Sequence, residues 1–237
     1  MSRQIVLDTE TTGLSAEGGD RIIELGCVEL VNRKLTGNNL HLYLNPERDS
    51  HEDALKVHGI SNEFLRDKPK FAERVQDILQ YLQGAELIIH NASFDVGFLD
   101  KELELVGLAP LSAHVGGVID TLAMAKEMFP GKRNSLDSLC DRLGVDNSSR
   151  TLHGALLDAE LLADVYINMT RGQDALLIMD EATAGAGGTT VAAVDLSRIA
   201  LTVLTASAQE LAEHEEVLVQ IDKSSSGKTI WRTLSEA

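Results

Sequence analysis

A chain of 237 residues is long enough for one substantial α/β domain, and about 60 residues would then remain for a small appendage. Its 43% of hydrophobic and 24% of charged residues are ordinary for a soluble protein, and no apolar run approaches the roughly 18 to 20 residues that span a bilayer. The net charge of −16 argues against a domain that holds nucleic acid through a basic surface, so metal ions and a partner would have to supply much of that attraction.

The first 45 residues are predicted to form three antiparallel strands. Apolar runs cover residues 4–7, 22–30 and 40–44, and glycine-containing turns separate them. Strands joined in this way form a meander, in which each strand pairs with the next along the chain.

After Pro46 the pattern becomes mainly helical, interrupted by short apolar strands at residues 87–90 and 118–119. Asn91 or Ser93 can cap the helix that follows the first of these strands. This order of elements predicts an α/β fold in which helices cover the faces of a mixed sheet. The helices are expected over residues 53–58, from Asn62, and over residues 71–82, 91–106, 121–129, 135–143 and 154–170.

From Gly172 onward the composition changes. Residues 182–193 are mostly Ala, Gly, Thr and Val, without large apolar anchors or periodicity, and we interpret them as part of a linker. Short elements could follow at residues 199–204, 208–214 and 217–221. The predicted domains are therefore residues 1–172, a flexible linker over residues 173–198, and a C-terminal segment over residues 199–237.

The N-terminus and the cysteines indicate the compartment. The N-terminus enters a strand pattern at once, without the apolar segment and small-residue cleavage site of a signal peptide, so we expect a cytoplasmic protein. Cys27 and Cys140 each lie in an apolar periodic stretch, and we expect buried, reduced thiols there in place of a disulfide or a metal site.

An acidic pair, Asp8 and Glu10, is predicted at the end of the first strand. Residues two apart on a strand point to the same face, so both carboxylates project together. At about 4 Å and an effective dielectric near 20, their repulsion is on the order of 4 kcal/mol, which a divalent cation would turn into attraction. The alternative is that they are solvated residues of the turn that contains Gly13.

Two later segments supply further candidates. Asp95 falls in the first turn of the helix after the strand at residues 87–90, where it could equally be a favourable helix-start charge. His153 and Asp158 are about 140° apart on an ideal helix, so they need different roles. Asp158 could ligate a metal while His153 reaches a water from outside the ligand shell, although a histidine there is often an ordinary helix-start residue.

The segments DTETTG (8–13), HNASFD (90–95) and HGALLDA (153–159) together resemble the three exonuclease motifs of the DEDDh family. The resemblance implies a ribonuclease H-like fold, which agrees with the meander and mixed sheet. It also implies metal-dependent 3′→5′ exonuclease activity that releases nucleoside 5′-monophosphates.

The resemblance further implies two divalent ions, Mg²⁺ or Mn²⁺, held by Asp8, Glu10, Asp95 and Asp158, with His153 as the catalytic general base. The chemistry is consistent, because Mg²⁺ prefers oxygen ligands and two ions can stabilise both oxygens of an in-line displacement at phosphorus. A histidine with a pKa near 6.5 can take a proton from water near neutral pH.

Residues 57–60 (VHGI) and 129–137 (FPGKRNSLD) extend the similarity to the proofreading subunits of bacterial replicative DNA polymerases. That resemblance implies that His58 and Asp53 contact the terminal nucleotide, together with Glu10 and Asp158. As alternatives, His58 could simply end a helix and Asp53 could start it.

Other substrate contacts are less defined. Phe94 and Phe98 could stack on bases, but aromatic residues at positions i and i+4 are more often part of a core. The chain also departs from its relatives in a short connection between Gly13 and Arg21 and in a variable stretch at residues 48–56, which puts contacts there in doubt.

The C-terminal segment resembles a polymerase-binding tail, with His214 and residues 230–232, including Trp231, as the best matching points. Tethering to a larger protein would raise the local concentration of the DNA 3′ end without strong intrinsic affinity for DNA. Residues 173–178 stand where the family carries a sliding-clamp motif, or they continue the last helix. The implied partners are the DNA 3′ end and the polymerase alpha subunit, with the sliding clamp and a theta-like accessory subunit as further candidates.

Selectivity for mismatches would require no reading of bases, because a mispaired 3′ end frays at lower cost than a paired one. Two other functions stay open. An RNA exonuclease of the same family is disfavoured by the long tail, and a structural polymerase subunit without catalysis is disfavoured by the presence of all five motif residues.

Overall fold

The computed structural model describes residues 3–148, 150, 152–171 and 206–225. The chain divides into two compact units, residues 1–184 and 185–237, and each is described by itself. The predicted linker and clamp-binding segment, the possible element at residues 199–204 and Trp231 lie outside the described residues.

The first unit is built on one mixed sheet. The strands β1 (Arg3–Thr11), β2 (Ile22–Val31) and β4 (Leu40–Tyr43) pair antiparallel, which confirms the meander. β5 (Glu86–Ile89) pairs parallel with β1, and β6 (Gly117–Asp120) pairs parallel with β5. The order is β3-β2-β1-β5-β6, with β4 also on β2, and the two-residue β3 (Lys34–Leu35) was not predicted.

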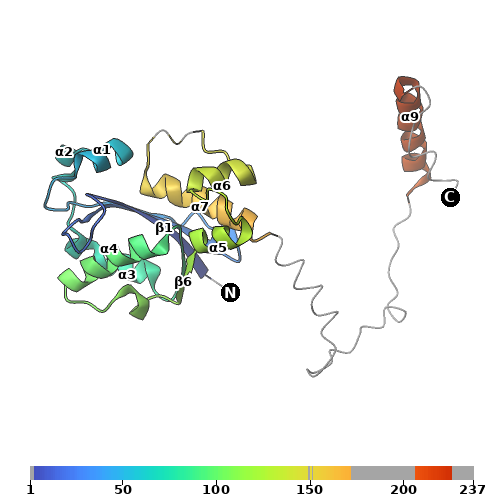
Figure 1. The fold of residues 1–237 in the computed structure, drawn as a ribbon. Coiled ribbons are helices and arrows are strands. Elements are labelled where there is room, and N and C mark those ends of the chain that lie inside the picture. The colour runs from blue at the N-terminus through green and yellow to red at the C-terminus, as the bar shows by residue number, and fades with distance from the viewer. Residues whose placement is uncertain (1–2, 149, 151, 172–205, 226–237) are drawn as a thin grey trace, which may run out of the picture. The chain divides into compact units, whose positions relative to one another are not determined.

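Helices cover both faces of this sheet (Figure 1), as the α/β pattern predicted. α3 and α4 pack on one face, and α5, α6 and α7 pack on the other. The bounds are α1 (Glu52–His58), α2 (Asn62–Leu65), α3 (Phe71–Leu82), α4 (Ala92–Leu105), a 3₁₀ turn (Leu111–Ala113), α5 (Thr121–Met128), α6 (Leu136–Leu143) and α7 (Ala155–Met169).

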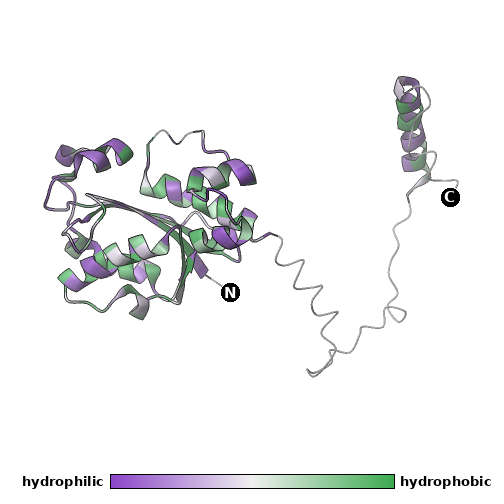
Figure 2. Cartoon of the chain, in the orientation of Figure 1, coloured by the Kyte–Doolittle hydropathy of each residue, from purple (hydrophilic) through white to green (hydrophobic). Residues whose placement is uncertain are grey.

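The alternation of β1 explains the two layers. Ile5 and Leu7 join the cluster that contains α3 and α4, and Val6 joins the cluster that contains α6 and α7. α1 and α2, coloured mainly purple in Figure 2, are polar and bury only one residue each, His58 and Leu65. These two short helices therefore stand at the edge of the domain, and their place matters for the site.

Two expectations about element ends need correction. β1 is longer than the apolar run at residues 4–7, because its pairing with β2 continues to Thr11; it includes Asp8 and Glu10, as expected, with Asp8 opposite Gly26. α4 begins after Asn91, but Asn91 has a left-handed backbone with φ 67° and makes no side-chain cap, and Ser93 lies inside the helix. The turn into α4 is therefore made by backbone conformation.

The described part of the second unit is a single helix, α9 (Ala208–Ser225), where two shorter elements were expected. It exposes apolar side chains at Leu211, Val217, Val219 and Ile221. None of the described helices is long and apolar enough to span a membrane. Cys27 and Cys140 are both buried and free, as expected.

Candidate active site

The first two acidic motifs meet at adjacent strands of the sheet. Asp8 and Glu10 lie near the end of β1, and Asp95 lies in the first turn of α4, directly after the neighbouring parallel strand β5. The backbone N–H of Thr9 donates to Asp95 Oδ1 at 3.1 Å, and the Thr9 hydroxyl donates to the same oxygen at 2.6 Å. Thr9, which lies between Asp8 and Glu10, therefore holds the Asp95 carboxylate in place.

The third motif reaches the site because α7 begins directly on the sheet. Gly26 of β2 is the register partner of Asp8, and a Cβ atom built on Gly26 would lie 2.2 Å from the backbone carbon of Ala155 and from the nitrogen of Leu156. Only a glycine permits this approach. It brings Asp158, which is 4% exposed, to the carboxylates of β1.

His153 lies in the loop just before α7, as expected. Its backbone N–H donates to the carbonyl of Val57 at 3.1 Å, and its half-exposed ring places Nδ1 3.4 Å from Asp158 Oδ2. One ligand atom each from Glu10, His153 and Asp158 lies within 4.8 Å of the others. The His153 ring could therefore share a metal ion with the carboxylates of Glu10 and Asp158.

The electrostatics of the cluster favour a cation. Burial, followed by the charges of Asp95, Asp158 and Glu10, raises the pKa of Asp8. Burial, followed by the charge of Asp158, raises the pKa of Glu10 to about 8. Burial also raises the pKa of Asp95 to about 7, although the hydrogen bonds from Thr9 oppose the shift. The raised pKa values show that the positive charge near these buried carboxylates is too small to balance their negative charge. Carboxylate oxygens are the ligands that Mg²⁺ and Mn²⁺ prefer, so this set of donors fits either ion.

Arg150 is the functional candidate that sequence reasoning missed. Its guanidinium donates to both oxygens of Asp158, from Nε and from Nη2, at 2.6 Å each. It also donates to Asp137 Oδ1 at 2.7 Å and to His153 Nδ1 at 2.9 Å. The only signal in the sequence is that Arg150 precedes the third motif by three residues, and a loop arginine has no periodicity that would mark it.

Two cavities open on the two sides of the acidic cluster. One of about 540 Å³ is lined by Asp8, Asp158 and His153 together with Lys126 and Lys132. Its two lysines and Arg150 balance the charges of the aspartates in this lining, whereas the chain as a whole is strongly acidic.

The other cavity, of about 550 Å³, is lined by Glu10, His58, Asp53, Phe94 and the highly exposed Leu14. Of the expected metal ligands, Asp8 and Asp158 line the first cavity and Glu10 lines the second. The expected nucleotide-binding residues His58 and Asp53 share the second one.

His58 is the last residue of α1 before the left-handed Gly59, as the helix-end alternative expected, but its side chain is buried and only 4% of the residue is exposed. The backbone N–H of Ile60 donates to His58 Nδ1 at 3.0 Å, so the neutral ring carries its proton on Nε2. Within the described part of the chain, that buried Nε2 has no hydrogen-bond partner. Burial lowers the pKa of His58, which keeps the ring neutral.

The other expected contacts divide between surface, cavity and core. Asp53 is exposed and pairs with Lys56 at 2.8 Å. Phe98 is 2% exposed and belongs to the core, whereas its neighbour Phe94 is partly buried and lines the second cavity. Phe98 is therefore a core residue, whereas Phe94 packs against that core and also lines the cavity.

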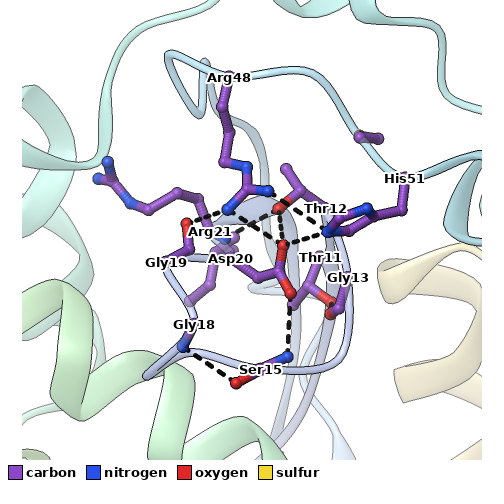
Figure 3. Close-up of polar contacts among 12 residues, drawn as sticks. Thr11, Thr12, Gly13, Ser15, Gly18, Gly19, Asp20, Arg21, Arg48 and His51 are labelled. Atoms are coloured by element: carbon purple, nitrogen blue, oxygen red, sulfur yellow. Dashed lines mark hydrogen bonds and ion pairs between the residues drawn. The ribbon is translucent and has the colours of Figure 1, made fainter.

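The wall of the second cavity is fixed by Asp20 (Figure 3). Asp20 accepts hydrogen bonds from the Thr12 hydroxyl and the Ser15 N–H at 3.0 Å each, and it lies 3.1 Å from His51 Nε2 and 3.2 Å from Arg48 Nη1. Burial alone would raise the pKa of Asp20, but these partners outweigh it and lower the pKa. The short connection after Gly13 is thus joined to the variable stretch near residue 48.

Comparisons with known proteins agree with this geometry. A family model described as exonuclease (RNase_T) matches residues 5–166. DNA polymerase III subunit epsilon of Pasteurella multocida is 52% identical over 237 residues, which cover 97% of this chain and 93% of the relative. The Escherichia coli protein of the same name is 49% identical over 239 residues, or 98% of each chain.

Solved structures share the fold. A structure of exonuclease X in complex with 5′ overhanging duplex DNA has a TM-score of 0.55 and 24% identity over 72% of this chain and 93% of that one. Exonuclease I from Methylocaldum szegediense has a TM-score of 0.64 and 18% identity over 77% of this chain and 43% of that one.

Proposed function

Because the chain belongs to the RNase_T exonuclease family and to its DNA polymerase III epsilon branch, we propose that Asp8, Glu10, Asp95 and Asp158 carry its activity as a 3′→5′ proofreading exonuclease. The observation that supports this assignment is the convergence of three distant segments. β1, the start of α4 and the start of α7 bring these four carboxylates to one end of the sheet. Proteins of this family are metal-dependent nucleases.

The finer assignment is two divalent ions, Mg²⁺ or Mn²⁺, held by the four carboxylates. When bound, such ions supply an activated water and neutralise the charge that develops on the scissile phosphate. His153 takes the proton from the attacking water as general base, because its ring stands beside Asp158 at the open side of the cluster.

The terminal nucleotide is proposed to occupy the second cavity, beside Glu10. His58 Nε2 is a buried donor that has no hydrogen-bond partner among the residues that the structure describes, which suits an acceptor on a sugar or a phosphate. Phe94 and Leu14 offer apolar surface to the base, and Asp53 lies at the rim. The first cavity, with Lys126 and Lys132, then receives the backbone of the preceding nucleotides.

The partners follow from the relatives and the tail. We assign residues 1–172 to the exonuclease domain, residues 173–198 to a linker with a sliding-clamp segment, and residues 199–237 to binding of the DNA polymerase III alpha subunit. The exposed apolar side chains of α9 offer contact surface for that subunit. A theta-like accessory subunit and a cytoplasmic location complete this proposal by analogy with a replication complex.

The test is a 3′-end release assay with the full chain and Mg²⁺. Oligonucleotides of one sequence carry a paired or a mismatched 3′ end, and an RNA version serves as a separate arm. We expect faster release of nucleoside monophosphate from mismatched DNA than from paired DNA, since the frayed end is cheaper to separate. Equal rates on both DNA ends would contradict proofreading, and a preference for RNA would move the chain to RNA processing.

The same assay with Asp8→Ala tests the site. Release should fall to background while capture by the purified alpha subunit stays at the level of the unaltered chain, because Asp8 and the tail lie in different units. Retained hydrolysis in Asp8→Ala would overturn the assignment of the metal ligands.

A further inference from the structure

Arg150 binds two side chains of the proposed catalytic site, the metal ligand Asp158 and the general base His153. Its side chain is only 7% exposed, and its two donors to Asp158 form the bidentate fork that is the strongest arginine–carboxylate geometry. Both oxygens of a proposed metal ligand are therefore engaged by a side-chain cation. A divalent ion that binds Asp158 must therefore share these oxygens with the guanidinium, and the two positive charges repel each other at this distance.

The same guanidinium also engages the proposed base. Arginine has no acceptor, so the 2.9 Å contact requires His153 Nδ1 to accept and places the proton of the neutral ring on Nε2. Nδ1 is the ring nitrogen that faces Asp158, at 3.4 Å. While Arg150 keeps this contact, the nitrogen nearest the carboxylates is not available to take a proton from water.

A second carboxylate holds the other side of the guanidinium. Arg150 Nη1 donates to Asp137 of α6 at 2.7 Å, and Asp137 is about half exposed and lies at the rim of the first cavity. Asn147 also donates to this carboxylate, at 3.3 Å. Asp137 thus offers Arg150 a contact that does not compete with the metal ligands.

We propose that Arg150 is a displaceable counter-cation: it holds Asp158 and His153 in the metal-free site, and it withdraws onto Asp137 when divalent ions enter. The proposal rests on the metal site proposed above. It follows from charge, since the carboxylates need a cation in either state, and Arg150 already reduces the repulsion at Asp8 and Glu10. The arginine therefore stabilises the fold without metal, and the ions must compete with it.

A counter-cation and a residue that orients a metal ligand have opposite effects on metal affinity. Removal of a residue that orients a ligand weakens metal binding, typically by about 10- to 100-fold. Removal of a competitor strengthens it. The measurement is titration of the full chain with Mn²⁺ alone by isothermal titration calorimetry, after chelator treatment and without DNA.

We expect Arg150→Gln to bind Mn²⁺ at least about fivefold more tightly than the unaltered chain, the lower end of typical coupling between sites. Its metal-free form should melt at a lower temperature, because Asp158 keeps a buried charge without its partner, and Mn²⁺ should restore most of that loss. Asp137→Asn should change the affinity the other way, because Arg150 then has less to hold it away from Asp158.

Lys126→Gln is the control for charge alone, because Lys126 lines the same cavity but is exposed. It should leave the Mn²⁺ affinity within about twofold. Arg150→Lys, which keeps the charge but cannot form the fork, should fall between the unaltered chain and Arg150→Gln, and it serves if the glutamine variant does not fold.

Unchanged or weaker Mn²⁺ binding by Arg150→Gln would overturn the counter-cation role. Failure of the metal site itself gives a different result, since the unaltered chain would then bind no Mn²⁺ or would bind it equally well as Asp8→Ala.

Discussion

Asp95 Oδ1 accepts two hydrogen bonds from Thr9, one from its backbone nitrogen at 3.1 Å and one from its hydroxyl at 2.6 Å. Thr9 is the residue between Asp8 and Glu10, so one side chain connects the first acidic motif to the second. The contact orients a carboxylate that is 3% exposed, and it opposes the rise in pKa that burial causes at Asp95.

Thr9→Val should therefore weaken both stability and activity. It removes one of the two donors to Asp95 while preserving shape, and the loss of a hydrogen bond to a buried charged group costs about 1 to 3 kcal/mol. Urea unfolding with chelator present measures this loss. Thr9→Ser retains the hydroxyl and should lie closer to the unaltered chain; equal loss in both variants would show that the methyl group, not the hydrogen bond, matters.

The metal-free protein should become less stable as the pH rises from about 5 to about 8. The raised pKa values, about 8 for Glu10 and about 7 for Asp95, mean that the folded chain binds protons more tightly than the unfolded chain. The free energy of unfolding is therefore largest below the ordinary pKa values of these two groups. It falls as the pH rises from those values to the raised pKa values of the folded chain. Thermal unfolding in chelator across this range measures the slope.

Mg²⁺ should reverse the trend, because the ion takes the place of the protons. The increase in melting temperature on addition of Mg²⁺ should be larger at pH 8 than at pH 6. Glu10→Gln removes one titrating group and should flatten the metal-free decline. A slope that is the same in this variant would assign the pH dependence to other residues.

Gly26→Ala should disrupt the site through the close contact between β2 and the start of α7. The added methyl group would lie 2.2 Å from backbone atoms of Ala155 and Leu156, so the start of α7 must move and take Asp158 with it. A displacement on the order of 1 Å at a catalytic group can cost about 100-fold in rate. Release of nucleotide from single-stranded DNA provides the measurement.

Gly97→Ala is the matched control, because nothing lies within 4 Å of a Cβ atom at Gly97 in α4. It should leave the release rate unchanged and slightly raise stability, as alanine favours a helix over glycine. Full activity in Gly26→Ala would contradict the tight contact between α7 and the sheet.

His58→Ala should raise the KM for single-stranded DNA more than it lowers kcat. The variant removes the buried Nε2 donor of the second cavity, and one hydrogen bond of about 0.5 to 1.5 kcal/mol corresponds to roughly a 2- to 13-fold change. Since burial lowers the pKa of His58, protonation of the ring should affect KM only at a lower pH than for an ordinary histidine. Asp53→Asn, at an exposed position paired with Lys56, should change KM less.

The sequence predicts most of the fold because the periodic elements are long and their ends carry strong signals. α3 has the predicted bounds Phe71–Leu82, with Phe71, Val75, Ile78 and Leu82 on its buried face. Local sequence patterns do not predict the last residue of a strand when that end of the strand is polar. β1 continues to Thr11 because pairing with β2 keeps the chain extended beyond its apolar run.

The carboxylates could be placed from the sequence because their motifs have fixed order, but their surroundings could not. The two donors from Thr9 and the approach of α7 to Gly26 depend on tertiary contacts between residues more than 80 positions apart. The role of Arg150 could not be predicted either, because it follows from ion pairs with Asp158 and Asp137, which only the fold brings together.

The most direct test of the four-carboxylate site is the anomalous scattering of Mn²⁺ in crystals of the full chain. We expect two peaks about 3.5 to 4 Å apart among the carboxylates of Asp8, Glu10, Asp95 and Asp158. Mn²⁺ bound elsewhere, with no peak among these four residues, would contradict it.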